Sequence, residues 1–175
     1  MRLVLGLLFS LAVAACVGLG TTWLVLTRGT AFGAIPIGAW VAWPKSGTRD
    51  VDPYTRATFA RTDDNGRPLD GRCDVLVSGT TPQARFWTIT LYDPQGKLIG
   101  NSVDRQGFTS QEVVRRSDGS FDVTVAPRIR SGNWLPTNGI ESYVLVLRLY
   151  DSPVGVATRA AREAPMPSVT VQSCP

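Results

Sequence analysis

Histidine is absent from this 175-residue chain. Its absence excludes Ser-His-Asp and Cys-His nucleophile systems, histidine-liganded zinc and imidazole acid–base catalysis. A glycine-rich phosphate-binding loop, a nucleophile elbow and a spacing of metal ligands are also missing, so we expect no metal and no cofactor. Chemistry by carboxylate, arginine, tyrosine or thiol groups remains open, as does a protein without catalysis.

A strong excess of charge is also lacking. The chain has 18 basic and 14 acidic residues, and Lys45 and Lys97 are the only lysines. Arg2 and Arg28 flank an apolar segment, so the part after Arg28 carries a formal charge of only +2. Nucleic-acid binding calls for a basic stripe or a more strongly basic domain. We therefore expect no nucleic-acid partner.

Cysteine is scarce, with three residues and no Cys-x-x-Cys pair, which excludes a thioredoxin-like motif and a cysteine metal site. Cys73 and Cys174 are the two cysteines outside the apolar segment. In an oxidising compartment they form a natural pair, and a bridge closing about 100 residues contributes roughly 4 kcal/mol in the chain-entropy model. Two unrelated free thiols remain the alternative.

The segment from Leu3 to Thr27 carries no charge. As a helix it extends roughly 37 Å, enough to cross a ~30 Å hydrocarbon core with some tilt. A cleaved signal peptide has a shorter apolar core, of about 7–15 residues. Val13-Ala14-Ala15-Cys16 also resembles a bacterial lipobox, in which Cys16 is acylated, but a polar tether usually follows such a cysteine. We favour an uncleaved signal anchor over both alternatives.

The orientation of this anchor follows from length rather than from charge, because one arginine lies at each end. The amino terminus is very short, whereas a large following domain is exported largely regardless of its charge. We expect a single-pass protein of the bacterial inner membrane whose C-terminal domain lies in the periplasm.

Three regions follow from composition: an anchor over 1–28, a stalk over 29–53 and a β-domain over 54–175. The stalk is rich in Gly, Pro and Trp, and we expect irregular structure there. Trp40 and Trp43 in it are either membrane-interface anchors or packing residues. A short helix is predicted from Asp52 to Arg61, since Asp52 is a suitable N-cap and Pro53 suits the next position.

The rest of the chain shows the period of two that is typical of half-buried strands. The alternating segments lie around Cys73–Ser78, Phe86–Tyr92 and Phe121–Val125, with short Asn-Gly and Asp-Gly turns between segments. Glu112–Arg116 and Phe121–Ala126 are predicted to form a hairpin, and Tyr143–Tyr150, apolar on both faces, a central strand. Because no long helical pattern alternates with these strands, we expect a mainly β fold, an antiparallel, jelly-roll-like β-sandwich.

Several aromatic and polar pieces follow one another in a set order: Ala84–Asp93, then Gly96, Leu98, Asn101 and Arg105, then Asp118–Ser120, Asn133–Pro136 and Leu147–Asp151. In order and spacing they resemble the short, membrane-anchored bacterial type of the family called domain of unknown function 1214. The resemblance covers roughly Arg72 to Pro175. That domain also forms the carboxy-terminal half of two-part proteins, paired with domain of unknown function 1254. The resemblance implies a β-sandwich and supplies no established reaction.

Arg148 is the most informative charged position, because it interrupts a strand that is apolar on both faces. A buried guanidinium needs a carboxylate or several acceptors, for which Asp93, Glu141 and Asp151 are candidates. A structural ion pair is one interpretation, and an anion-binding arginine in a cleft is the other. Arg85, and Arg105 beside Asn101, are candidates to join Arg148 in an acid-recognising cluster. Their alternative is a solvated face or local turn bonding.

Asn133 and Trp134 are candidates for a ligand platform, with an indole for stacking and an amide for hydrogen bonding. Burial of the indole and bonding of the amide to the backbone is the simpler interpretation. Tyr92 and Tyr150 each precede an aspartate, and in the functional interpretation they form polar rims of one pocket. Candidate carboxylates for glycosidase-like catalysis are Asp93, Asp104, Asp118, Glu141 and Asp151, most of which lie in turns that already explain them.

We therefore expect a non-catalytic, membrane-anchored envelope protein whose β-sandwich is a binding or assembly module. Its partners are the membrane and either a second copy of the chain or a larger membrane complex. The alternative is a carbohydrate- or carboxylate-directed periplasmic hydrolase or binding protein.

Overall fold

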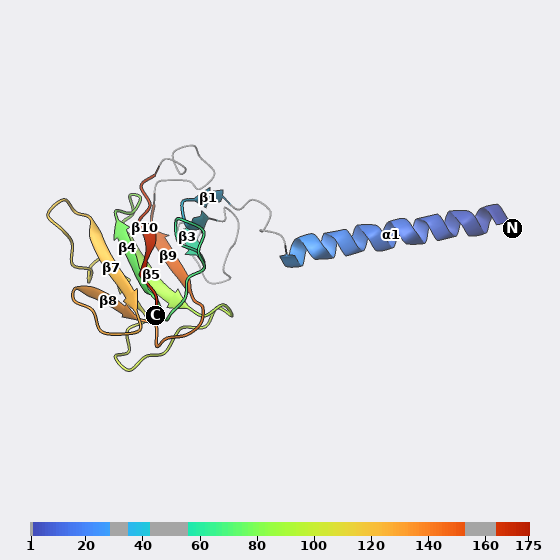
Figure 1. Cartoon of the computed structure of the whole chain (residues 1–175). Coiled ribbons are helices and arrows are strands. Elements are labelled where there is room, and N and C mark those ends of the chain that lie inside the picture. The colour runs from blue at the N-terminus through green and yellow to red at the C-terminus, as the bar shows by residue number, and fades with distance from the viewer. Residues whose placement is uncertain (1, 29–34, 43–55, 153–163) are drawn as a thin grey trace. The chain divides into compact units, whose positions relative to one another are not determined.

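The computed structural model describes residues 2–28, 35–42, 56–152 and 164–175. The chain divides into two units, Met1–Ala34 and Ile35–Pro175. In the described residues the first unit holds a helix, and the second holds ten strands (Figure 1).

The helix of the first unit, α1, spans Arg2–Arg28, so the helical conformation expected for the uncharged segment is confirmed. Thr21 and Thr22 donate their hydroxyl protons to the carbonyls of Val17 and Gly18, at 2.8 and 2.7 Å, which keeps these polar groups satisfied within the helix. Among the described residues, no helix is long and apolar enough to span a membrane.

The ten strands of the second unit form two sheets. A six-stranded sheet has the order β1-β2-β3-β9-β5-β6, and a four-stranded sheet has the order β10-β4-β7-β8. The strands are β1 (Ile35–Ile37), β2 (Trp40–Ala42), β3 (Arg56–Ala60), β4 (Asp74–Gly79), β5 (Phe86–Tyr92), β6 (Gly107–Thr109), β7 (Phe121–Ala126), β8 (Asn133–Pro136), β9 (Val144–Tyr150) and β10 (Ser168–Ser173).

The core lies between the two sheets, because alternate residues of each strand point inward. Val75 and Val77 of β4, Ile89 and Leu91 of β5, and Val123 of β7 are completely buried. The rings of Trp87 in β5 and Phe121 in β7 meet across the core, 4.8 Å apart between centroids. The mainly β prediction is confirmed.

Strand β9 occupies the centre of the six-stranded sheet, as its apolar pattern predicts. It pairs antiparallel with β3 on one side and with β5 on the other. Leu145, Leu147 and Leu149 belong to the core, while Val144 and Val146 are buried on the opposite face of the strand. A strand buried on both faces explains the continuous apolar run.

One pairing departs from the antiparallel arrangement that we expected. Strand β8 runs parallel to β7, with Val123 opposite Asn133 and Ala126 opposite Pro136, whereas the other named pairings in the described residues are antiparallel. The indole nitrogen of Trp134 donates to the carbonyl of Ala126 at 3.1 Å and helps to hold the short return loop. The four-stranded sheet is therefore mixed.

Residues 35–42 are a correction to the irregular stalk predicted over 29–53. They form β1 and β2, and β2 joins the main sheet by pairing with β3. Trp40 is 1 % exposed, and its indole nitrogen donates to the carbonyl of Pro167 at 2.6 Å, so the packing interpretation of this residue holds. Trp43 and the rest of the predicted stalk lie outside the described residues.

The helix predicted from Asp52 to Arg61 is wrong for its described part, which is strand β3. β3 lies between β2 and β9, where Thr58 and Ala60 are buried. Backbone pairing on both sides and burial of alternate residues outweigh the weak helical preference of a short alanine-containing segment. Asp52 and Pro53 lie outside the described residues.

The hairpin predicted from Glu112 to Ala126 forms only in part. Its turn is present, because the amide of Gly119 donates to Arg116 and the amide of Arg116 donates to Ser120. Its second arm is β7, but its first arm is no strand and keeps a single bridge, Arg115 to Phe121. The side chain of Asn133 bonds both the amide and the carbonyl of Val114, so this backbone is satisfied without a strand partner.

The bridge between Cys73 and Cys174 is confirmed, with their Cα atoms 4.2 Å apart and 101 residues between them in sequence. It links the start of β4 to the end of β10, the strand that pairs with β4 at one edge of the smaller sheet. The bridge therefore secures the last strand of the domain.

Candidate functional site

The eight residues predicted as ligand-binding do not form one cluster. Among the described residues, four of them line two separate hollows and the other four lie in strands and loops outside these hollows. Tyr92 and Arg148 line one hollow, Arg105 and Asn133 line another, and Arg85, Asn101, Trp134 and Tyr150 line neither.

The outer-face pocket is a hollow of about 170 Å³ on the face of the six-stranded sheet that points away from the core. Its residues come from three neighbouring strands and one turn: Phe59, Arg61, Tyr92, Asp93, Pro94, Gly96, Val144, Val146 and Arg148. Strand register places them together, because Phe59 is opposite Val146 and Tyr92 is opposite Val144. Alternation along each strand then turns these side chains to the same face.

Arg148 corrects the expectation of a buried guanidinium paired with a carboxylate. It is only half-buried, because its position in β9 faces outward with Val144 and Val146. Its guanidinium carbon lies 5.2 Å from the ring centroid of Tyr92. The ion pairs of the described residues involve other arginines: Arg67, Arg72, Arg85, Arg116 and Arg130. Neither Asp93, Glu141 nor Asp151 is its partner there.

Tyr92 and Tyr150 do not form rims of one pocket. They lie at opposite ends of the paired strands β5 and β9, with Tyr92 opposite Val144 and Tyr150 opposite Phe86. Tyr150 packs against the ring of Phe86, 5.5 Å between centroids. Arg85 lies at this end of the sheet with Asp151, 3.9 Å away in an exposed pair, and so does not join Arg148.

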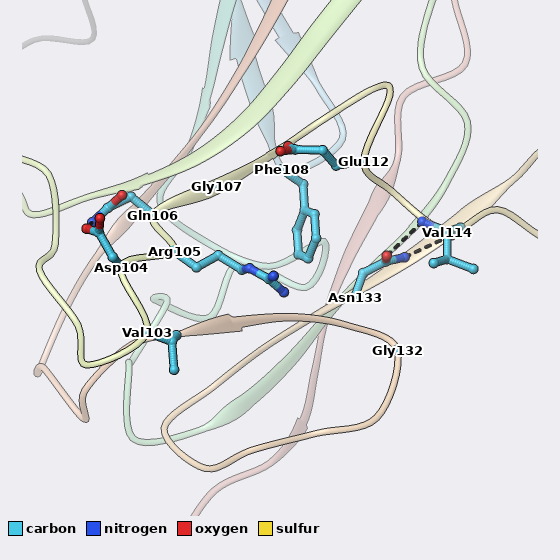
Figure 2. A pocket seen from close by; sticks show the side chains of 10 residues that line it. All are labelled: Val103, Asp104, Arg105, Gln106, Gly107, Phe108, Glu112, Val114, Gly132 and Asn133. Atoms are coloured by element: carbon cyan, nitrogen blue, oxygen red, sulfur yellow. Dashed lines mark hydrogen bonds between the residues drawn. The ribbon is translucent and has the colours of Figure 1, made fainter.

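The edge pocket is a larger hollow, of about 560 Å³, lined by residues 103–108 and by Glu112, Val114, Gly132 and Asn133. β6 ends the larger sheet and β8 ends the smaller one, so the pocket lies at an open edge of the sandwich. Figure 2 shows Arg105 directed toward the ring of Phe108, which lies 5.0 Å from its guanidinium carbon. The lining is mainly polar.

Asn101 closes the loop that leads into the edge pocket and does not line it. Its side-chain amide donates to the carbonyl of Arg105 at 2.7 Å. Its side-chain oxygen accepts from the amides of Val103 and Arg105, at 3.2 and 3.0 Å. Asn101 therefore bonds within its own loop.

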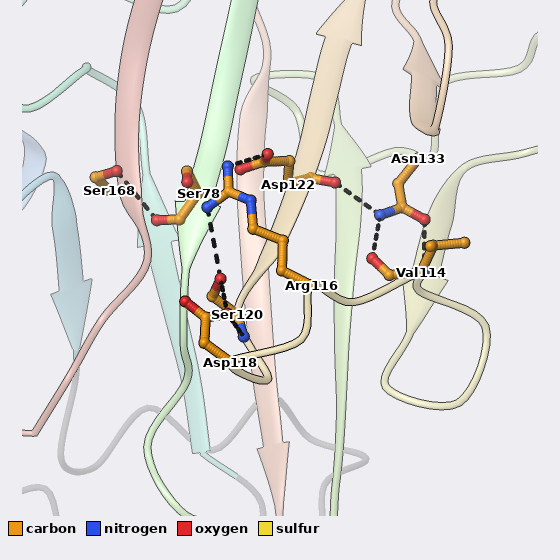
Figure 3. A network of polar contacts seen from close by, with 8 residues as sticks. All are labelled: Ser78, Val114, Arg116, Asp118, Ser120, Asp122, Asn133 and Ser168. Atoms are coloured by element: carbon orange, nitrogen blue, oxygen red, sulfur yellow. Dashed lines mark hydrogen bonds and ion pairs between the residues drawn. The ribbon is translucent and has the colours of Figure 1, made fainter.

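Asn133 is 7 % exposed, and both ends of its amide are bound to backbone. Its oxygen accepts from the amide of Val114 at 2.8 Å, and its nitrogen donates to the carbonyls of Val114 and Asp122, at 2.8 and 2.7 Å (Figure 3). The indole nitrogen of Trp134 is likewise bound to a backbone carbonyl. These contacts favour the structural interpretation of the Asn-Trp-Leu-Pro piece.

A polar network on the surface of the smaller sheet surrounds the turn before β7. Arg116 bridges the carboxylate of Asp122 and the hydroxyl of Ser120, and Ser120 in turn donates to Asp118 at 2.6 Å (Figure 3). The hydroxyl of Ser120 lowers the pKa of Asp118, and the backbone amide of the same residue adds to this effect. The network orders a turn and keeps the carboxylate of Asp118 ionised.

Two of the carboxylates considered for catalysis, Asp93 and Asp118, accept hydrogen bonds from backbone amides of their turns. Asp93 accepts from the amides of Gln95 and Lys97, at 3.0 and 2.8 Å, as a turn-initiating aspartate does. In the edge pocket, the hydroxyl of Thr109 lowers the pKa of Glu112, and its amide adds to the effect. A general acid at neutral pH needs a raised pKa. The pKa of Glu112 is instead lowered, so this carboxyl group is not suited to that role.

The third hollow, about 380 Å³, lies beside the disulfide and is lined by three arginines, Arg72, Arg128 and Arg130. Arg72 pairs with Asp70 at 2.6 Å, and Arg130 pairs with Asp74. The hydrogen bond and charge of Arg72 lower the pKa of Asp70. Within the described residues no group of three or more histidine, cysteine, aspartate or glutamate side chains is arranged to hold a metal ion.

The family model described as "Protein of unknown function (DUF1214)" matches residues 55–154, more than half of the chain. The chain belongs to this family. The DUF1214 segment contains every residue of the outer-face pocket and of the edge pocket, whereas β1, β2, β10 and Cys174 lie outside it. The family resemblance expected from the sequence is confirmed.

Two solved structures share the DUF1214 chain's fold. The VPA0106 protein of Vibrio parahaemolyticus is 20 % identical in sequence and superposes with a TM-score of 0.61. The match covers 73 % of this chain and 33 % of the VPA0106 chain. A putative uncharacterized protein of Burkholderia cenocepacia is 18 % identical in sequence and superposes with a TM-score of 0.52. That match covers 87 % of this chain and 40 % of the Burkholderia chain. This chain thus spans two-fifths or less of those proteins. No curated protein matches it.

Sequence reasoning missed Phe59 and Arg61 of the outer-face pocket. Phe59 lies in β3 and Arg61 directly follows it, and both alternate with the buried residues Thr58 and Ala60. The sequence therefore contained the alternation of buried and outward-facing residues that is typical of a strand. The five-residue strand is short enough for alanines and a plausible N-cap to favour a helix instead.

Proposed function

We propose that the chain is a bacterial envelope protein, held in the inner membrane by α1, whose β-domain lies in the periplasm as a non-catalytic binding or assembly module. The observation that carries this proposal is the combination of an uncharged 25-residue run, Leu3 to Thr27, with a bridged pair of cysteines in the following domain. Disulfides persist in oxidising compartments such as the periplasm.

The character of α1 supports insertion into lipid. Its described apolar side chains are largely exposed within the unit, including Phe9 at 72 % and Leu19 at 73 %. Exposed apolar side chains on this scale call for an apolar surrounding. Trp23, near the carboxyl end of the helix, suits the membrane–water interface.

Three observations support a role without catalysis. The chain has no histidine. In the described residues the carboxyl groups with shifted pKa values, Asp63, Asp70, Glu112 and Asp118, all have lowered values and stay ionised at neutral pH. Burial raises the pKa of Tyr143, so its phenol stays protonated. None of these groups is suited to transfer a proton near pH 7.

Membrane fractionation tests the location. In cells expressing the full chain, we expect it to stay in the membrane after alkaline extraction, with residues 1–28 intact by mass spectrometry. Protease added to spheroplasts is expected to degrade the β-domain. A soluble chain beginning after residue 28 identifies a cleaved signal peptide, and a lipid adduct on an amino-terminal Cys16 identifies a lipoprotein. Either result overturns the anchor.

Native mass measurement tests the assembly role. Purified in a mild non-ionic detergent without cross-linking, the protein is expected to run as a homo-oligomer or with a membrane partner. A bare monomer rejects assembly and leaves ligand binding as the role of the module.

The alternative is a carbohydrate- or carboxylate-directed periplasmic protein, and one observation favours its binding form. The outer-face pocket brings Arg61 and Arg148 together over an apolar floor of Val144 and Val146. Guanidinium groups match the geometry of carboxylates. This supports a carboxylate ligand rather than a sugar, whose hydroxyls need polar partners.

A further inference from the structure

The outer-face pocket combines two cations with an apolar floor. We propose that it binds one small organic monocarboxylate whose apolar body is about the size of a benzene ring. Arg148 takes the carboxylate and Arg61 supplies a second positive charge. The inference rests on the binding form of the proposed module and names the class of its ligand.

The charge of the pocket selects a monoanion. Arg61 and Arg148 contribute two positive charges and Asp93 one negative charge, which leaves one positive charge in excess. One oxygen of Asp93 is occupied by the amides of Gln95 and Lys97, which fixes this carboxylate in its turn. A ligand with one negative charge therefore neutralises the pocket.

Within the described residues, the guanidinium groups of Arg61 and Arg148 donate no hydrogen bond to another side chain or to the backbone. Arg148 lies against the ring of Tyr92, and the guanidinium carbon of Arg61 lies 5.9 Å from the ring centroid of Phe59. Contact with an aromatic ring attracts a guanidinium to the electron-rich face of the ring and takes no N–H···O hydrogen bond from it. A guanidinium without such bonds can donate N–H groups in pairs to a carboxylate. Neither arginine belongs to an ion pair in the described part of the chain.

The floor of the pocket selects an apolar body. Val144 and Val146 line this floor, and neither offers a polar side-chain atom. Phe59 and Tyr92 form the flanking walls from strands on either side of β9. A polyol on this floor loses hydrogen bonds to water without replacing them.

The volume sets the size of the ligand. The pocket measures about 170 Å³, and an apolar protein cavity of about 150 Å³ holds one benzene molecule. Benzoate and cyclohexanecarboxylate therefore fit in size and charge, whereas a disaccharide is too large.

Titration of the full-length protein tests the proposal. The protein is exhaustively dialysed in a non-ionic detergent, and binding of benzoate is followed by calorimetry and ligand-observed NMR. We expect saturable binding at one site. Benzamide, which has the same shape without the charge, is expected to bind about ten-fold more weakly or worse, because it loses charge-assisted hydrogen bonds. Inorganic phosphate, which lacks the apolar body, is expected not to compete.

Variants place the ligand in the pocket. Arg148→Gln is expected to weaken benzoate binding about ten-fold or more, and Arg61→Gln by a smaller factor. Arg85→Gln is the matched control, because Arg85 is an exposed arginine directly before β5 and outside the pocket. If the Arg148→Gln variant fails to fold, benzoate binding by the Arg61→Gln variant, changed at an exposed position, tests the proposal instead. Absence of benzoate binding, equal affinity for benzamide, or equal weakening by Arg85→Gln overturns the proposal.

These outcomes are separable from those of the proposed function. Loss of benzoate binding leaves the fractionation result and the native mass unchanged, so anchor and assembly stand. A chain found outside the membrane but binding benzoate through Arg148 refutes the anchor and keeps the pocket.

Discussion

At the residue scale, side chains that look suited to ligands in the sequence are largely used to bind backbone. Asn133 is the clearest case, since its amide replaces the strand partner that the segment at Val114 lacks. Asn101 and Asp93 do the same for their own loops. Arg148, in contrast, has no carboxylate partner in the described residues and faces a pocket.

Asn133→Ala is expected to destabilise the domain by about 2–4 kcal/mol, because it removes three hydrogen bonds and leaves groups of Val114 and Asp122 unpaired at a site with little water. Urea unfolding followed by tryptophan fluorescence measures the change. Asn101→Ala, in a half-exposed loop, is the control and is expected to cost less. Equal losses for the two variants contradict the structural role of Asn133.

Asp63 predicts a pH dependence of stability. Burial, the largest contribution, raises its pKa, but hydrogen bonds from the amides of Arg67, Asn65 and Val171 and the charge of Arg67 together outweigh it and lower the pKa. A lowered folded-state pKa stabilises the fold above the unfolded-state value, about 3.9, and this stabilisation is lost as the pH falls through the folded-state value.

Asp63→Asn is therefore expected to lower the free energy of unfolding at pH 7 and to flatten its decline below about pH 5. Unfolding curves between pH 7 and pH 2.5 measure both effects. An unchanged acid slope in the variant contradicts the assignment to Asp63.

At the element scale, β10 is held to the domain from several directions. It pairs with β4, and the disulfide of Cys174 directly follows its end. The amide of its Val169 donates to the carboxylate of Asp64, and the carbonyl of Val169 accepts from the amide of Asp64. The other carboxylate oxygen of Asp64 accepts from the amide of Ala39, just before β2. Asp64 therefore ties the first hairpin to the last strand.

Replacing Cys73 and Cys174 by serine is expected to cost up to about 4 kcal/mol, since the bridge closes a long loop. Hydrogen exchange is expected to rise first at Val169 and Thr170, because β10 lies at a sheet edge and opens locally more easily than central strands. Cys16→Ser is the control. Unaltered exchange in β10 contradicts its role as a secured edge strand.

At the scale of the whole molecule, the compact β-unit starts at Ile35 rather than at residue 54. β1 and β2 extend the six-stranded sheet, and Trp40 belongs to the core. The boundary of the folded unit thus lies upstream of the DUF1214 segment, which begins at residue 55.

Two truncations distinguish these boundaries. A chain of residues 35–175 is expected to unfold with the same free energy as the full-length protein within about 0.5 kcal/mol. A chain of residues 54–175 lacks Trp40, and the loss of a buried tryptophan costs about 3–5 kcal/mol. Denaturant unfolding in the same detergent measures both. Equal stability of the two chains contradicts the role of the first hairpin.

The sequence by itself determined the class of the fold, the helix, the central strand and the cysteine pair. These follow from local patterns: an uncharged run, a period of two, an apolar segment on both faces, and two cysteines outside the helix. Tertiary structure decided the rest, because strand register depends on partners far apart in sequence. Pairing of β3 with β9, together with the reach of the long side chains, placed Arg61 and Arg148 in one pocket. Register also separated Tyr92 from Tyr150, and pairing turned a weakly helical segment into a strand.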